Sequence, residues 1–267
     1  MLKDITIGQF FPGNSFMHRL DPRFKIVITG IFIIMLFCTE GFAGLLTGFV
    51  FLLLEFLLSR IPLKLMLKSL KPIIPIIIFT SVLNLFFIDG VTVFSIWKIK
   101  ITDVGIRTTL VMIVRIIMLI CGSSLLTYTT SPITLTDAIE QLLSPFKKIG
   151  LPVHELAMMM TIALRFIPTL IEETDKIMSA QKARGADLES GGLIQRAKAL
   201  IPILIPLFVS AFRRAEELAL AMECRCYQGG EGRTRLKTLK SGGKDYAALA
   251  VSTLFLSLVI FLGAVTS

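Results

Sequence analysis

Apolar residues are concentrated in five long runs that are separated by polar segments. The runs occupy residues 24–38, 43–58, 72–88, 104–128 and 246–265. In α-helical form, and with a flanking turn added, runs of this length can cross a hydrocarbon layer about 30 Å thick. The pattern predicts an all-α membrane protein with about five transmembrane helices. Four of them fall within a membrane domain at residues 1–128, and the last falls within residues 245–267.

The connection between the third and fourth runs has a different composition. Asp89-Gly90 ends the third run, and the segment VTVFSIWKIKIT that follows is rich in β-branched and aromatic residues. Such residues are enriched in extended structure. We therefore expect a short extracellular extended segment or hairpin at about residues 89–103, with Trp97 at the headgroup interface.

Residues 129–244 combine frequent charges with apolar residues that recur every three or four positions. One series contains Leu156, Met160, Ala163, Ile167 and Leu170, and a second contains Ile194, Ala197, Ile201, Leu204, Phe208, Ala211, Ala215, Leu218 and Met222. This spacing predicts two long amphipathic helices. Gly191-Gly192 would separate them, and Gly229-Gly230 would end the second. The apolar stretch at residues 199–212 is short for a further span and contains two prolines.

The distribution of lysine and arginine predicts how the chain is oriented. The segments assigned to the inside carry Lys3, Arg19, Arg23, Lys25, Arg60, Lys64, Lys68 and Lys71. Such residues favour the cytoplasmic face. We expect a multi-pass protein of the cell membrane, with the N-terminus and residues 129–244 in the cytoplasm and the C-terminus outside. The formal net charge of +9 fits contact with an anionic leaflet, acidic partners or both. Nucleic acid is disfavoured, because no basic stripe carries interleaved stacking aromatics.

The sequence predicts no catalytic, metal or nucleotide site in this chain. Its only histidines, His18 and His154, are far apart, and its four cysteines are spaced like packing residues. The glycine-rich segment QGGEGRT lacks the spacing of a phosphate-binding loop. If ATP drives this protein, another chain must bind it.

Glu55, Arg107 and Arg115 fall within predicted spans, where burying a charge is costly. Glu55 and Arg107 lie near span ends, so we expect both to reach the headgroups. Arg115 lies about twelve residues into the fourth span, close to the middle of the membrane. Two interpretations of Arg115 stay open: an internal pair or carbonyl contact that holds the bundle, and a contact to a membrane partner or substrate path.

Two arginines with small neighbours end the two predicted amphipathic helices. The triplets are Ala183-Arg184-Gly185 and Cys224-Arg225-Cys226. An arginine at a helix end can project a fork of donors suited to carboxylates, and small neighbours leave room for its tip to enter a cleft. A cation that complements the helix dipole would explain one such arginine, but it does not explain two matched triplets. The pattern favours two docking points.

Four segments resemble the transmembrane coupling subunit of energy-coupling factor transporters. They are QKARGAD, RRAEELALAMECRCYQGG, ALRFIPTL and LDPRFKI, and the resemblance covers essentially the whole chain. It implies an integral membrane scaffold that sits on two homologous ATP-binding-cassette ATPases and holds an exchangeable substrate-binding membrane subunit. Residues 129–244 would then be a cytoplasmic coupling domain.

The resemblance also implies roles for the two triplets. Ala183, Arg184 and Gly185 would form one contact to the ATPase pair, and Cys224, Arg225 and Cys226 would form the other. The second triplet departs from the commoner Ala-Arg-Gly form, and Cys226 lacks the backbone freedom of glycine. ATP and Mg would be bound by the partner ATPases, with no cofactor in this chain. The imported substrates would be vitamins or transition-metal ions.

Three other functions remain open at this point. A permease that lines its own substrate path would need facing polar residues in its spans, which offer chiefly Arg115, Asn84, Ser123 and Ser124. A membrane-embedded enzyme would need paired carboxylates or a metal cluster at membrane depth, where only Glu55 is found. The third is a scaffold for an assembly unrelated to transport.

Overall fold

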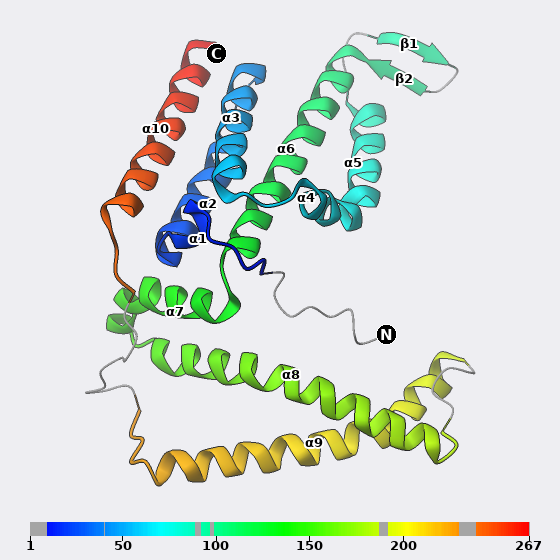
Figure 1. Ribbon diagram of the computed structural model, residues 1–267. Helices are drawn as coiled ribbons and strands as arrows, with labels where there is room; N and C mark the ends of the chain where they lie inside the picture. The colour runs from blue at the N-terminus through cyan, green and yellow to red at the C-terminus, as the bar shows by residue number, and fades with distance from the viewer. Residues whose placement is uncertain are drawn as a thin grey trace. The chain divides into compact units, whose positions relative to one another are not determined.

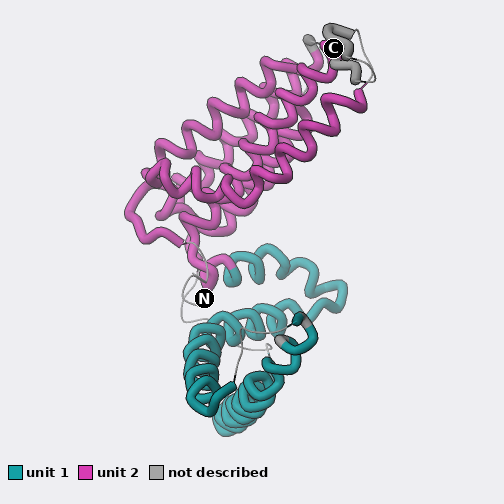
Figure 2. Tube along the Cα trace, turned by 90° about the vertical axis from the view of Figure 1, so that its right-hand side faces the viewer, with its two compact units in different colours: residues 1–7, 136–238 teal, residues 8–135, 239–267 magenta. Residues whose placement is uncertain are grey.

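The computed structural model describes residues 10–39, 41–88, 92–96, 99–186, 192–229 and 239–266. The chain is mainly α-helical and carries one two-stranded hairpin (Figure 1). It divides into two compact units, which Figure 2 colours separately. One contains residues 8–135 and 239–267, and we call it the membrane unit. The other contains residues 1–7 and 136–238, and we call it the long-helix unit.

The membrane unit contains seven α-helices, one 3-10 turn and the hairpin within the described residues. They are α1 (Phe16–Arg19), α2 (Pro22–Phe37), α3 (Gly41–Ser59), α4 (Leu63–Leu70), η2 (Lys71–Ile73), α5 (Ile74–Phe87), β1 (Thr92–Ile96), β2 (Ile99–Thr102), α6 (Asp103–Thr129) and α10 (Gly243–Thr266). The two strands pair antiparallel within the segment expected to be extended, while Trp97 lies outside the described residues.

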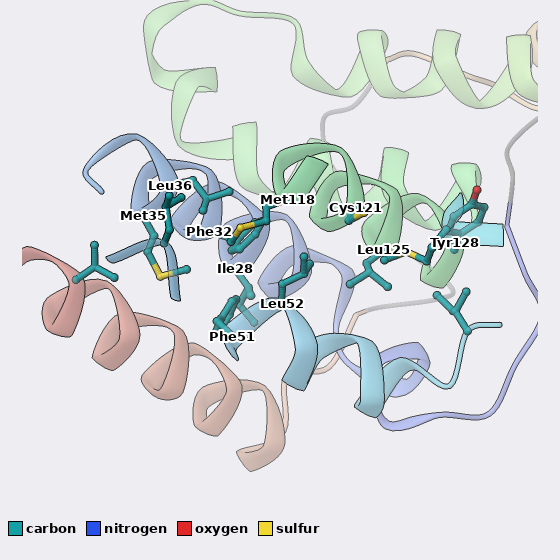
Figure 3. Packing of buried hydrophobic residues seen from close by; sticks show 14 residues of the cluster. Ile28, Phe32, Met35, Leu36, Phe51, Leu52, Met118, Cys121, Leu125 and Tyr128 are labelled. Carbon is teal, nitrogen blue, oxygen red and sulfur yellow. The ribbon is translucent and has the colours of Figure 1, made fainter. Parts of the chain in front are cut away.

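The core of the membrane unit lies between α2, α3, α6 and α10. Its most enclosed side chains include Phe32, Leu36, Met118 and Val259, each no more than 2% exposed, and Figure 3 shows the cluster. Small residues let the helices approach each other closely. A Cβ atom added to Gly122 of α6 would lie 2.3 Å from Cε1 of Phe32, so this position admits only glycine without a shift in the core.

Five segments of the described chain are long and apolar enough to cross a membrane. They are Gly41–Ser59, Leu63–Phe87, Asp103–Thr129, Val153–Ala183 and Gly243–Ala264. The number and the helical class agree with the sequence prediction, but one member differs. Val153–Ala183 (α8) is included with the lowest mean hydropathy of the five, 1.3. The predicted first span is missing from the set because α2 has only 16 residues.

The long-helix unit is built around two helices of 31 residues each. Its elements are α7 (Pro132–Leu143), which begins in the membrane unit, η3 (Ser144–Ile149), α8 (Val153–Ala183) and α9 (Leu193–Glu223). α8 and α9 pack against each other in opposite directions (Figure 1). The amide of Gln181 donates to the carbonyl of Pro202 at 3.4 Å, and Arg214 pairs with Glu173 at 2.9 Å. These contacts fix an antiparallel register between residues 173–181 of α8 and residues 202–214 of α9.

Candidate functional site

The end of α8 is closed by a Schellman motif centred on Arg184. Arg184 is the C-cap residue, and the N–H of Gly185 donates to the carbonyl of Lys182 at 3.0 Å. The N–H of Ala186 donates to the carbonyl of Gln181, also at 3.0 Å. Gly185 has a φ of +85°, the left-handed conformation that this motif requires after the cap. The third residue of the triplet is therefore small for a backbone reason as well as for access.

The end of α9 shows the same hydrogen-bond pattern around the second triplet. The N–H of Cys226 donates to the carbonyl of Glu223 at 2.8 Å, and the N–H of Tyr227 donates to the carbonyl of Met222 at 3.0 Å. Arg225 thus takes the cap position that Arg184 takes on α8. Cys226 has a φ of +55°, so a residue with a Cβ atom occupies the place of Gly185. The left-handed conformation costs such a residue about 1–2 kcal/mol.

Both triplets lie on the surface of the long-helix unit. All three residues of each triplet are exposed, and Cys224 and Cys226 are free thiols. Neither Arg184 nor Arg225 forms an ion pair or a side-chain hydrogen bond with another described residue. Each guanidinium also lies beside the negative end of a helix dipole. Two fully charged forks of donors are therefore available to a carboxylate on another molecule.

The antiparallel register places the two arginines at opposite ends of the helix pair. Gln181, close to Arg184, contacts Pro202 of α9, and Arg225 lies 23 residues further along the chain. At 1.5 Å per residue, the two ends are on the order of 35 Å apart. One small ligand cannot reach both arginines. The geometry instead suits two separate contacts.

A hollow of about 540 Å³ opens beside Arg225. It is lined by Met158 and Ile162 of α8, by Leu218 and Met222 of α9, and by Arg225, Cys226, Tyr227, Gln228 and Gly229. Methionine side chains adapt readily to a moving surface. The hollow combines apolar walls with the exposed guanidinium, which is the character of a protein-docking surface.

A cluster of polar residues lies near the points where the chain leaves the membrane unit and returns to it. Asp21 caps α2 and pairs with Arg23 at 2.6 Å. The carboxylate of Asp245, at the start of α10, accepts hydrogen bonds from the N–H of Asp21 at 2.8 Å and of Gly242 at 2.7 Å. The ammonium of Lys25 donates to the carbonyl of Thr129 at 3.0 Å. Both connections to the long-helix unit are thereby attached to the start of α2.

The sequence contains a local signal for part of this cluster. The segment LDPRFKI carries an aspartate before a proline, which is the pattern of a capped helix start, and a lysine that enters an apolar run. Its partner Asp245 lies 224 residues away, so no local pattern could identify it. Burial alone would raise the pKa of Asp21. The hydrogen bonds and charge of Arg23, aided by Lys25, outweigh burial and hold that pKa below its ordinary value of 3.8.

Arg115 has an internal partner in the structure. Its Nη2 donates to the carbonyl of Thr39 at 2.8 Å, just beyond the C-terminal end of α2. A cation at that end also complements the helix dipole. The Nε atom of Arg115 is buried and has no hydrogen-bond partner among the described residues. The carbonyl contact is therefore present, while a contact to a membrane partner stays a prediction.

Glu55 is buried within the membrane unit, and the expectation that it reaches the headgroups stays a prediction. The side chain lies in α3, one turn before Ser59, and the residue is only 8% exposed. The reason is that α1 and α10 cover it, and neither helix is a sequence neighbour of α3.

Comparison with known proteins gives one consistent family. The family model described as CbiQ, cobalt transport protein, matches residues 13–236. A protein of Thermosediminibacter oceani named energy-coupling factor transporter transmembrane protein EcfT is 56% identical over 95% of this chain and 96% of its own length. Proteins with the same name from Ruminiclostridium cellulolyticum and Bacillus subtilis are 53% and 46% identical. The first alignment covers 98% of each chain, and the second covers 99% of this chain and all of the relative.

The range that matches the family model, residues 13–236, contains residues of both units. Family membership at this level of identity and coverage does not depend on any single motif. The chain belongs to the family of energy-coupling factor transporter transmembrane proteins.

Proposed function

We propose that this chain is the transmembrane coupling subunit of an ATP-driven importer of the energy-coupling factor class. It transmits conformational change from two ABC ATPases to an exchangeable substrate-binding membrane subunit that takes up a vitamin or a metal ion. The proposal rests on two exposed arginines, each at the C-terminal end of its helix. Because α8 and α9 are antiparallel, the two arginines lie at opposite ends of the helix pair. Family membership supports the same function and does not favour a permease that lines its own path.

The two arginine ends act as docking points for the two ATPases. Arg184 and Arg225 lie in the same hydrogen-bond pattern at a helix end, as expected if two homologous surfaces receive them. Their separation, on the order of 35 Å, allows each to enter a different ATPase. When nucleotide binding closes the ATPase pair, the docked ends follow it, and α8 and α9 shift relative to each other. Such shear between packed helices is an established mode of conformational coupling.

The chain itself holds neither ATP nor Mg in this proposal, and it is a non-catalytic subunit. The partner ATPases bind the nucleotide and metal and hydrolyse ATP. In this proposal α8 and α9 transmit movement from the ATPases, so both must remain helical while the ATPases change conformation. The ion pair between Arg214 and Glu173 and the antiparallel packing serve that requirement.

The spans in this proposal are α2, α3, the α4–α5 segment, α6 and α10, in the cell membrane. α2 spans although it is short, because it forms the centre of the buried cluster and its flanking turns extend it. α8 stays in the cytoplasm, because its apolar residues alternate with charges and its hydropathy is the lowest of the candidates. This set places the N-terminus inside, the hairpin outside and the C-terminus outside.

Co-purification with the ATPase pair tests the docking role. The double variant Arg184→Glu/Arg225→Glu reverses both charges, and we expect it to lose the ATPases while the membrane unit keeps its thermal stability. The matched control is Arg213→Glu, which reverses an exposed charge within α9 and should retain them. Retention of both ATPases by the double variant would overturn the proposal.

A further inference from the structure

A small cavity inside the membrane unit contains one acidic group in otherwise apolar surroundings. The cavity has a volume of about 200 Å³ and lies between α1, α2, α3 and α10. Met17, Ile28 and Phe51 form part of its wall, and every lining residue except Glu55 is apolar. Glu55 is 8% exposed. No described residue donates a hydrogen bond to its carboxyl group or forms an ion pair with it.

An unpartnered carboxyl group in such a place calls for a ligand. Burying it as an anion without a partner is costly, and even the neutral acid loses its hydrogen bonds to water. Ordered water in a cavity needs two to four polar partners, whereas this wall offers only the carboxyl group itself. The group that fits best has an apolar body and one cationic N–H donor. Its N–H would satisfy the carboxylate, and its body would replace water on the apolar wall.

The opening of the cavity indicates where such a ligand comes from. Leu54 and Leu58 of α3 and Val251 of α10 line the cavity and are also exposed on the outside of the unit. In a membrane protein, exposed apolar side chains on spanning helices face hydrocarbon. The cavity lies one turn from the end of α3 and close to the start of α10, so it meets the boundary between acyl chains and headgroups. A molecule of the bilayer can therefore enter from the side.

Two arginines that are close in sequence to lining residues favour one class of lipid. Arg19 is the last residue of α1, next to the lining residue Leu20, and Arg60 follows α3 two residues after Leu58. Both arginines are exposed. A carboxylate inside and two arginines at the edge complement a zwitterion whose ammonium points inward and whose phosphate stays outside. A helix or loop of a partner protein is too large for a cavity of about 200 Å³.

We propose that this cavity is a binding site for the ammonium headgroup of an ethanolamine phospholipid, with Glu55 as the acceptor of its N–H donors. The choline headgroup has no N–H and cannot make this contact. The glycerol headgroup carries no cation. A bound lipid would join α1, α3 and α10 at the end of the bundle where the chain connects to the long-helix unit. The site belongs to the membrane unit, the arginine triplets belong to the long-helix unit, and the proposal does not depend on the role of the triplets.

Native mass spectrometry of the full-length chain tests this site. The delipidated protein is supplied with phosphatidylethanolamine, phosphatidylcholine or phosphatidylglycerol of identical acyl chains. We expect phosphatidylethanolamine to bind the wild type about tenfold more tightly than phosphatidylcholine, which is the value of one charge-assisted hydrogen bond. Glu55→Gln should remove the preference. Glu216→Gln, a matched change at an exposed acid on α9, should keep it.

A second variant tests the cavity without touching the charge. Ala248→Leu adds apolar volume to the wall and should also lower phosphatidylethanolamine binding, while phosphatidylglycerol binding stays unchanged. A thermal melt of each variant identifies any that fails to fold. If Glu55→Gln is unstable, the effect of Ala248→Leu on phosphatidylethanolamine binding tests the proposal. Equal preference in wild type and Glu55→Gln would overturn the proposal. So would loss of a membrane protein partner from Glu55→Gln with lipid binding unchanged.

Discussion

The two units differ in how they enclose their apolar residues. The membrane unit has its own core, in which Phe32, Leu36 and Met118 are almost completely buried. The long-helix unit buries few apolar side chains among its described residues, namely Ala138, Val153, Ala157 and Ile203, while Phe208 is 61% exposed and Phe212 is 68% exposed. Exposed apolar surface of this extent marks an interaction site. The membrane unit encloses a core of its own, whereas the long-helix unit exposes apolar side chains that we propose its partners cover.

The largest expected effect comes from removing one phenylalanine from each unit. Phe32→Ala leaves a cavity in a close-packed core and should lower the free energy of unfolding by about 3–5 kcal/mol. Phe208→Ala removes an exposed ring and should change it by no more than about 0.5 kcal/mol. Thermal unfolding of the purified chain in detergent measures both. Equal losses would mean that Phe208 is buried within the chain, and the contrast between the units would fail.

The next effect concerns the polar cluster that attaches the connections to α2. Asp245→Ala leaves the N–H groups of Asp21 and Gly242 without their acceptor. We expect a loss of roughly 1–3 kcal/mol, the usual cost of an unsatisfied buried donor. Chemical unfolding monitored by circular dichroism would measure it, with Glu216→Ala on the exposed face of α9 as the control. A loss no larger than in the control would show that water replaces the carboxylate.

A smaller effect distinguishes the two helix ends from each other. Cys226→Gly relieves the positive φ at the end of α9 and should stabilise that end by about 1 kcal/mol. Gly185→Cys introduces the same conflict at the end of α8 and should destabilise it by a similar amount. Amide hydrogen exchange at the two ends reports each change locally. Opposite signs are expected, and the same sign at both ends would contradict the shared cap geometry.

The smallest effect is a pH dependence in the membrane unit. Asp21 has a pKa below its ordinary value of 3.8 in the folded chain. A lowered folded pKa means that this group stabilises the fold fully above 3.8 and that the contribution disappears as the pH falls through the lower folded value. Wild type should therefore lose more stability on acidification below 3.8 than Asp21→Asn does. Parallel acid unfolding curves for the two proteins would exclude this contribution.

The sequence predicted the helices well and the three-dimensional clusters poorly, for physical reasons. Long apolar runs located α3, α6 and α10, and apolar periodicity located α9, in each case from the residues of the helix itself. Neither pattern could show that α1 and α10 cover Glu55, or that Asp245 completes the cap at Asp21, because those neighbours are remote in sequence. The sequence prediction and the structure differ over one span, because α8 is long and apolar enough to cross a membrane and α2, which carries the predicted first span, has only 16 residues.

The two triplets show the same limit at a smaller scale. Glycine after a helical arginine predicts a left-handed cap, so the conformation of Gly185 follows from sequence. Cysteine carries no such preference, and the matching conformation of Cys226 emerged only with the hydrogen bonds of Tyr227 and Met222. The role of both triplets as docking points stays a prediction.

Site-specific photocrosslinking tests the central claim most directly. A photoreactive amino acid is placed at position 183 and, in a second protein, at position 224, each beside one of the two arginines in the assembled membrane complex. An equivalent probe at exposed position 192 is the control. The account predicts adducts with an ATPase subunit from both triplet positions and a weaker reaction from the control. Adducts formed only within the chain itself, from either triplet, would contradict it.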